Sequence, residues 1–221
     1  MKISILNSPN HSAKSRIKNN IKFIVIHYTG MQSERVCIRR LTSKSSEVST
    51  HYLINRKGSI TRLVDEKKTA WHAGKSKWKN SINLNNQSIG IELVNKGHQF
   101  GYEKFSKKQI TNLILLCKRL VKKYKIKKQN IVGHSDIAPL RKKDPGEKFP
   151  WFLLAKKKIG YWHNVRKKNI KNQNLNKNVL RKFFFNNLYK IGYRYFDKKK
   201  TSKNDLNVIK AFQRRFRQNK V

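Results

Sequence analysis

Apolar residues in this chain fall into short continuous runs and into longer runs with helical spacing. The runs IKFIVIH and SIGIELVN each predict a buried strand, and the first is followed by the breakers Thr29 and Gly30. HYLINRKGSITRLV predicts two strands around a turn at Arg56–Gly58, and NIVGH predicts another short strand.

Two helices are predicted among these strands. Residues 33–42 have helical spacing at Val36, Cys37 and Leu41, and a longer helix runs from Ser106 to about residue 124. The apolar face of the longer helix comprises Ile110, Leu113, Ile114, Cys117, Leu120, Val121 and Tyr124. Ser106 and Gln109 have the spacing of a capping box. Strands that alternate with helices predict an α/β fold with a mixed central sheet flanked by helices.

The remaining segments divide the chain into four parts. Residues 1–20 are polar and predicted to be irregular, residues 21–163 form the main domain, and residues 164–177 form an Asn/Lys-rich linker. Residues 178–221 hold two helical patterns, which together are too small to bury much apolar surface alone. We therefore expect this small helical module to pack on the main domain. Within that domain, residues 75–87 are predicted to be a loop that contains Trp78.

The charge balance of the chain is strongly basic. Its 221 residues include 53 Lys and Arg against 11 Asp and Glu, a formal net charge of +42. Such a field favours polyanionic partners and makes nonspecific adhesion to nucleic acid or anionic membranes plausible. The basic residues are spread along the chain, as expected when Lys, Asn and Ile are abundant together, and this pattern favours a solvated surface over a dedicated nucleic-acid site.

Cysteine usage and the absence of long apolar stretches bear on the compartment. Cys37 and Cys117 form no CxxC pair and are predicted to be buried free thiols. No stretch approaches the ~20 apolar residues of a membrane span. The first 18 residues have too short an apolar run for a secretion signal and no lipoprotein cysteine. We expect a cytoplasmic protein if the chain is complete as given, with the periplasm or cell envelope as the alternative.

Candidate chemistry lies at the ends of two predicted strands. His27 ends one apolar run, His134 ends another, and Asp144 follows in a loop that contains Pro139 and Pro145. Two imidazoles and one carboxylate make a three-ligand zinc site with one open position, as in catalytic zinc centres. A strand histidine is also compatible with simple burial in the core, and spacing alone does not separate these alternatives.

Five motifs then appear in a fixed order: VIHYTG, STHYLI, AWHAG, SIGIELVN and GHSDIAPLRKKDPGEKFPW. Together, over about residues 21–155, they resemble the zinc-dependent N-acetylmuramoyl-L-alanine amidases, and most of all the AmpD/AmiD branch of that family. The family also includes phage lysozyme-amidases and peptidoglycan recognition proteins. The resemblance implies a bacterial hydrolase with one Zn²⁺ per chain that acts in peptidoglycan turnover or muropeptide recycling.

The resemblance also implies roles for individual residues. His27, His134 and Asp144 match the zinc ligands of the family, Glu92 matches the acid that activates water, and Lys142 matches the cation that stabilises the tetrahedral intermediate. A carboxylate can carry the proton from water to the leaving amine, and an ammonium group can stabilise an oxyanion. From the residues alone, Glu92 is also compatible with a strand carboxylate paired with a lysine, and Arg141 and Lys143 flank Lys142.

Other histidines and one tryptophan are candidates for the substrate side of the site. His72 matches a position that lines the groove, and Trp71 is compatible with stacking on substrate or with core packing. His51 is predicted to pack or to support the site. Three histidines carry no motif and are predicted to lie on the surface: His11, His98 and His163.

The implied reaction is hydrolysis of the amide between the lactyl group of N-acetylmuramic acid and L-alanine, in peptidoglycan or in anhydro-muropeptides. LYKIGYRYF and NVIKAFQRRFRQ resemble two helices of a peptidoglycan-binding module, so the helical part is expected to be a partial module of that kind. The alternatives are a non-catalytic peptidoglycan-binding protein of the same fold and, because of the charge, a nucleic-acid-binding protein. We expect a monomer that binds no nucleic acid specifically.

Overall fold

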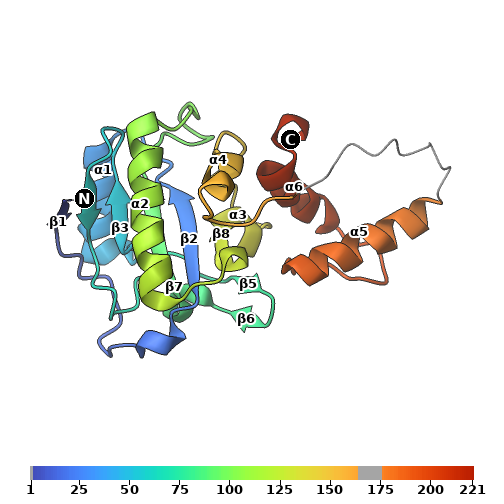
Figure 1. The fold of residues 1–221 in the computed structure, drawn as a ribbon, viewed down its shortest axis with the longest axis horizontal. Helices are drawn as coiled ribbons and strands as arrows, with labels where there is room; N and C mark the ends of the chain where they lie inside the picture. The colour runs from blue at the N-terminus through green and yellow to red at the C-terminus, as the bar shows by residue number, and fades with distance from the viewer. Residues whose placement is uncertain (1, 164–175) are drawn as a thin grey trace.

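A six-stranded mixed sheet forms the centre of the fold in the computed structural model, which describes residues 2–163 and 176–221 (Figure 1). Its strands are ordered β1-β4-β3-β7-β2-β8. They are β1 (Ile3–Ile5), β2 (Phe23–Tyr28), β3 (Tyr52–Ile54), β4 (Ile60–Arg62), β7 (Ser88–Leu93) and β8 (Ile131–Gly133). Only β3 and β4 pair antiparallel, across the predicted turn, and the other neighbours are parallel. The predicted α/β class with a mixed sheet is confirmed.

Helices cover both faces of this sheet. They are α1 (Glu34–Thr42), α2 (Lys107–Tyr124), α3 (His134–Ile137), α4 (Trp151–Lys156), α5 (Lys177–Ile191) and α6 (Asp205–Phe216). Short 3₁₀ turns in the described part of the chain connect elements or follow them: Lys18–Asn20, Lys44–Ser46, Leu84–Gln87, Lys128–Asn130 and Gln218–Lys220. The linker predicted at 164–177 lies almost wholly outside the described residues.

Helix α2 lies across one face of the sheet, as Figure 1 shows, and begins after the predicted cap. Ser106 Oγ accepts a hydrogen bond from the Gln109 amide at 3.1 Å, which is one half of the capping box. The other half was predicted wrongly. Gln109 Nε2 donates instead to the carbonyls of Ile54 and Val94, at 3.0 and 3.1 Å, and so ties α2 to the sheet.

Three short segments differ from the sequence prediction. Residues 3–5, expected to be irregular, form β1 at the sheet edge, parallel to β4. The predicted loop at 75–87 contains a hairpin of β5 (Lys77–Trp78) and β6 (Ser81–Ile82). His134 does not end a strand, because it opens the single turn of α3. Strands of two or three residues and one-turn helices are too short to show a period, so the pattern could not reveal them.

The C-terminal helices α5 and α6 pack beyond β8, against the edge of the sheet that carries α3 (Figure 1). Tyr193 and Phe185 are buried in one apolar cluster with Val25 of β2 and Trp78 of β5. The Tyr193 ring lies edge-on to Trp78, with centroids 4.9 Å apart. The helical module therefore shares part of its core with the main domain.

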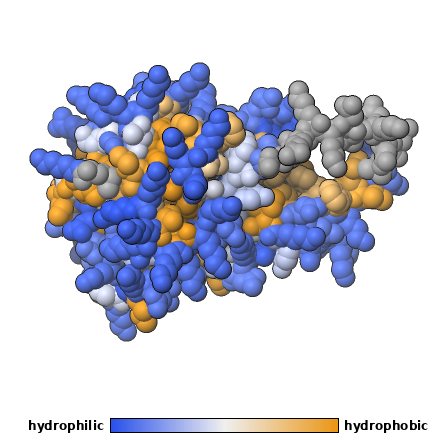
Figure 2. All heavy atoms as spheres, in the orientation of Figure 1, coloured by the Kyte–Doolittle hydropathy of each residue, from blue (hydrophilic) through white to orange (hydrophobic). Residues whose placement is uncertain are grey.

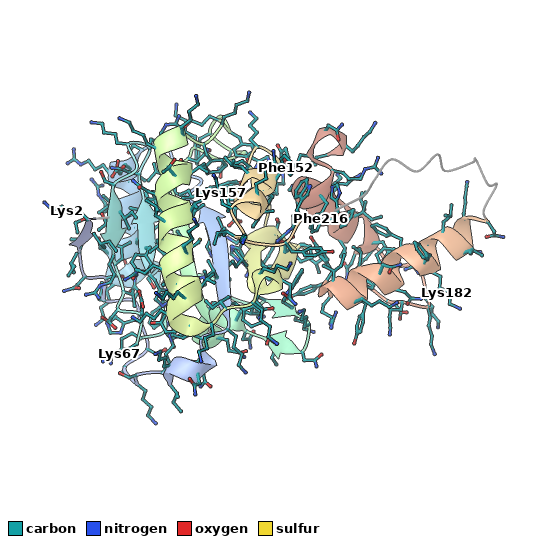
Figure 3. All side chains as sticks on the ribbon, in the orientation of Figure 1. Lys2, Lys67, Phe152, Lys157, Lys182 and Phe216 are labelled. Atoms are coloured by element: carbon teal, nitrogen blue, oxygen red, sulfur yellow. The ribbon has the colours of Figure 1, made fainter. Side chains whose placement is uncertain are left out.

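Basic side chains are distributed over the surface. Hydrophilic residues cover most of the face shown in Figure 2. Figure 3 labels four exposed lysines from separate parts of the chain: Lys2, Lys67, Lys157 and Lys182. The same figure labels Phe152 of α4 and Phe216 of α6, whose rings both lie 5.8 Å from Trp162.

Within the described ranges, the structure has no helix long and apolar enough to span a membrane. Both cysteines are buried free thiols, as predicted.

A buried carboxylate links α2 to the sheet. Glu66 is 4% exposed and forms ion pairs with Arg119 and Lys123, both at 2.6 Å. It also accepts hydrogen bonds from the hydroxyls of Tyr52 and Tyr124. Burial by itself raises the pKa of Glu66, but the donors and the charge of Arg119 outweigh burial and lower that pKa to about 2.

This lowered pKa predicts an acid-dependent contribution to stability. An unfolded-state glutamate titrates near 4.5, so Glu66 stabilises the fold above that pH, and its contribution is lost as the pH falls toward about 2. Because both cations are partly exposed, we expect this contribution to be about 2 kcal/mol. Urea unfolding of wild type and Glu66→Gln at pH 6 and pH 2.5 measures it. The difference in free energy of unfolding should shrink at the lower pH.

The matched control is Asp65→Asn, which changes the neighbouring carboxylate. Asp65 is exposed and pairs with Arg62 at 3.0 Å on the surface. Exposed pairs contribute about 0–1 kcal/mol, so this variant should lie close to wild type at both pH values. A Glu66→Gln penalty that is the same at pH 6 and pH 2.5 would contradict the prediction.

Candidate metal site and groove

Two histidines and one aspartate converge at the ends of the parallel strands β2 and β8. These strands are neighbours in register, so the sheet brings His27 beside His134. His27 Nδ1 lies 2.9 Å from His134 Nδ1 and 3.0 Å from Asp144 Oδ2, and His134 Nδ1 lies 3.1 Å from the same oxygen. All three residues are buried, and their geometry is compatible with one metal ion. Tetrahedral zinc spaces its ligand atoms by about 3.3 Å, close to these distances.

A chain of hydrogen bonds fixes the tautomer of His27. The Ser88 hydroxyl donates to the Leu84 carbonyl at 2.7 Å, so Ser88 Oγ accepts from His72 Nε2 at 3.1 Å. His72 Nδ1 is then the acceptor for His27 Nε2, at 3.0 Å. Since a neutral imidazole carries one proton, His27 Nδ1 presents a lone pair to the site.

His134 is oriented in the same way from the other side. Its Nε2 lies 3.1 Å from the Ala73 carbonyl and 3.3 Å from Arg141 Nη2. The shorter contact makes Nε2 a donor to the carbonyl, which leaves a lone pair on Nδ1. Two imidazole lone pairs and the Asp144 carboxylate therefore face one another with no proton between them. A cation at their centre resolves this repulsion, and a set of two nitrogens and one oxygen suits zinc.

The pKa shifts agree with a neutral His27 beside an ionised aspartate. Burial, and then the neighbouring His134, lowers the pKa of His27 to about 4, although Asp144 opposes the shift. Burial alone would raise the pKa of Asp144. The surrounding His134 and His27 outweigh burial and hold that pKa well below its usual value, so the carboxyl is ionised.

Gly90 makes room for His72. A Cβ at residue 90 would lie 2.4 Å from the His72 ring, so only glycine allows the ring to rest on β7. The Gly90 amide donates to His51 Nδ1 at 3.0 Å, and burial followed by the charge of Arg16 lowers the pKa of His51 to about 3. His51 therefore supports the strand beneath His72 and does not reach the groove, in agreement with its predicted packing role.

Glu92 lies beside His27 on the neighbouring strand. The two residues are paired in register on β7 and β2, so their side chains share one face of the sheet. Glu92 Oε2 is buried and has no hydrogen-bond partner among the described residues, and none of the ion pairs formed there includes Glu92. Burial first, and then Asp144, raises the pKa of Glu92 to about 8, whereas Lys142 opposes the rise. The alternative of a lysine-paired strand carboxylate therefore has no support.

The three consecutive cations at 141–143 have different surroundings. Arg141 donates to the carbonyls of Ala73 and Lys75, which fastens the loop after Trp71 to the loop before Asp144. Lys142 lowers the pKa of both His27 and Glu92, so its charge acts on the site. Lys143 is not among the charges that shift these two pKa values. Electrostatics therefore favours Lys142 over its neighbours, although all three cations line the groove.

The site opens into a groove of about 890 Å³. His72 and Trp71 both line it, as do residues of α1, of the segment just before it and of the 96–102 loop. These further lining residues include Met31, Gln32, Val36, Arg40, His98 and Phe100. Val36 was expected on the buried face of its helix, but it is 45% exposed because it borders this groove.

His98 lies on the surface, as predicted, and also forms part of the groove wall. Its Nδ1 lies 2.8 Å from the Tyr28 hydroxyl, and its Nε2 lies 3.1 Å from Glu147 Oε2. The ring stacks on Tyr102 with centroids 4.4 Å apart. His98, Tyr28, Tyr102 and Glu147 come together only in the tertiary structure, and no local sequence motif marks them as a group.

Comparison with known proteins identifies relatives of this chain. Residues 17–147 match the family model described as N-acetylmuramoyl-L-alanine amidase. The N-acetylmuramoyl-L-alanine amidase AmiD of Escherichia coli is 44% identical over 161 residues, which cover 67% of this chain and 57% of that protein. The 1,6-anhydro-N-acetylmuramyl-L-alanine amidase AmpD of Haemophilus influenzae is 44% identical over 107 residues, or 47% of this chain and 55% of that protein. The matched regions thus span little more than half of these relatives.

Solved structures extend the likeness to the helical part. The complex of Escherichia coli AmiD with anhydro-N-acetylmuramic acid-L-Ala-D-γ-Glu-L-Lys has a TM-score of 0.78 and 36% identity, covering 94% of this chain and 84% of that one. AmpDH3 of Pseudomonas aeruginosa has a TM-score of 0.80 and 29% identity, covering 97% and 90%. Both matches are too long to be confined to the sheet domain.

Proposed function

Because this chain belongs to the N-acetylmuramoyl-L-alanine amidase family, we propose that it is a zinc-dependent hydrolase of the lactyl–L-alanine amide in peptidoglycan-derived substrates. The observation that carries the proposal is the meeting of three unprotonated ligand atoms at the groove floor, 2.9 to 3.1 Å apart. A purely structural histidine pair does not need an adjacent ionised carboxylate facing the same point.

We propose that His27, His134 and Asp144 hold one zinc ion per chain. Zinc bound there supplies Lewis acidity, which makes water nucleophilic at neutral pH and polarises the amide carbonyl. His72 and the Ala73 carbonyl keep the two ligand rings in the required tautomer. All three residues line the groove, so a substrate bound there would reach a metal that they hold.

Glu92 and Lys142 supply the remaining chemistry in this proposal. Glu92 takes the proton from the attacking water and returns it to the nitrogen of the leaving L-alanine, which departs as a neutral amine. Burial raises the pKa of Glu92, which makes its carboxylate a stronger proton acceptor than an exposed glutamate. Lys142 stabilises the negative charge that develops on the carbonyl oxygen.

The groove walls favour a substrate that combines sugar, peptide and carboxylate groups. Trp71 and Phe100 offer aromatic surface, and Arg40 and Lys143 offer positive charge. Stem peptides carry carboxylates, and the related AmiD structure contains a muramyl peptide. We therefore propose muropeptides as the substrate class, in either soluble or wall-bound form.

Product analysis tests the function. The zinc-reconstituted protein is incubated with a soluble anhydro-muropeptide and, separately, with insoluble sacculi. We expect a zinc content near one per chain and release of a stem peptide with a free L-alanine amine, because the cut bond joins that amine to the lactyl group. Comparing the two substrates shows which form is preferred.

Two outcomes would oppose the proposal. A zinc content near zero after reconstitution, or one unchanged in Asp144→Ala, would remove the metal assignment. Zinc binding with substrate retention but no new amine would instead favour a non-catalytic peptidoglycan-binding protein.

A further inference from the structure

Asp136 connects the helical module to the turn that carries His134. It lies two residues after His134 and is 1% exposed. Its Oδ1 accepts from the Tyr193 hydroxyl at 2.5 Å, and its Oδ2 accepts from Arg215 Nη1 at 2.6 Å. Oδ2 also accepts from the Gly133 amide at 2.8 Å. One buried carboxylate thus holds the backbone on the N-terminal side of His134 together with two side chains of the helical module, Tyr193 just after α5 and Arg215 in α6.

The same turn is bonded to the backbone of the third candidate ligand. The Ser135 amide donates to the Asp144 carbonyl at 2.8 Å. Gly133, His134 and Ser135 are consecutive, so the position of this turn sets the positions of both His134 and Asp144. A displacement of α3 would separate atoms that now lie 3.1 Å apart.

The two donors from the helical module are themselves fixed. Arg215 is 3% exposed, donates through Nη2 to the Ile131 carbonyl at 3.0 Å, and lies over the Trp151 ring at 4.1 Å. Tyr193 is fully buried against Trp78. Neither side chain touches the groove, so their contact with Asp136 has no direct part in binding substrate.

We propose that Tyr193 and Arg215 are positioning residues, which act through Asp136 to hold His134 and Asp144 in their metal-binding arrangement. This inference rests on the proposed zinc site. Without its donors, the Asp136 carboxylate would be a buried charge with only the Gly133 amide as partner, which is strongly unfavourable. The carboxylate would then move toward water and take the α3 turn with it.

Zinc affinity is the readout that separates positioning from general stability. Tyr193→Phe removes only the hydroxyl, and Arg215→Met removes the charge while keeping an apolar stem on Trp151. Partners of metal ligands change affinity by about 10–100-fold, and these donors act one step further away. We therefore expect the zinc Kd, measured by competition with a chromophoric chelator, to rise about tenfold in each variant.

Arg181→Met is the matched control within the same helices. Arg181 pairs with Asp205 at 2.7 Å, between α5 and α6, and has no contact with Asp136. This variant should lower the melting temperature of the protein without changing its zinc Kd. An equal loss of zinc affinity in Arg181→Met would show that the effect is only structural and would overturn the inference.

The remaining outcomes are equally decisive. Suppose that wild type binds zinc and that the zinc Kd of both Tyr193→Phe and Arg215→Met lies within twofold of the wild-type value. That result would overturn the positioning role and leave the proposed function intact. Failure of wild type to bind zinc would overturn the proposed function itself. If Arg215→Met does not fold, the nearly isosteric Tyr193→Phe still decides the question.

Discussion

Replacing Glu92 by Gln is expected to lower the rate of muropeptide cleavage by about 10²–10⁴-fold while the zinc content stays near one per chain. The carboxyl lies beside His27 in the sheet, but it is not one of the three converging ligands. Glutamine keeps the size of the side chain and cannot accept the proton of water. Single-turnover rates and metal analysis on the same preparation measure both quantities.

Glu103→Gln is the control for this experiment. Glu103 is a partly exposed carboxylate that pairs with Arg56 at 2.8 Å and does not line the groove. Its variant should cleave muropeptides at the wild-type rate. A Glu92→Gln rate within about threefold of wild type would mean that the proton is carried by another group.

The order of elements and the candidate ligand set could be predicted because both depend on local patterns. Strand β2 and helix α2 have clear apolar periods, and His27 and His134 follow apolar runs that become neighbouring parallel strands. Asp144 was a candidate from its place in the proline-containing loop after His134, and the resemblance to the amidase family implied the same residue. The structure adds that the candidate ligand atoms of the three residues lie within 3.1 Å of one another.

What the sequence could not predict depends on long-range contacts. Asp136 and Arg215 are 79 positions apart, and their ion pair exists only because α6 packs beside β8. Gln109 has the spacing of a capping box, yet its side-chain amide donates to the backbone carbonyls of Ile54 and Val94. Nothing in the sequence marks these two carbonyls as its partners. Propensity rules describe neighbours along the chain, so a buried polar contact between distant elements escapes them.

Lys142 is the candidate for stabilising the oxyanion, a role that the sequence left open among three adjacent cations. Lys142→Ala should lower the cleavage rate by about 10²–10³-fold, the usual cost of removing one group that stabilises a developing oxyanion. Its ammonium forms no ion pair with the described part of the chain, and its charge lowers the pKa of both Glu92 and His27. The charge of Lys142 therefore acts on the candidate site, and its side chain lines the groove.

Lys143→Ala provides the matched comparison, because the next residue carries the same charge and also borders the groove. If general attraction of acidic substrate were the cause, both variants would raise KM alike and added salt would diminish the effect. Stabilisation of the transition state predicts instead that only Lys142→Ala lowers kcat, with zinc content unchanged. A lowered kcat in Lys143→Ala, with Lys142→Ala near wild type, would move the catalytic cation to the neighbouring residue.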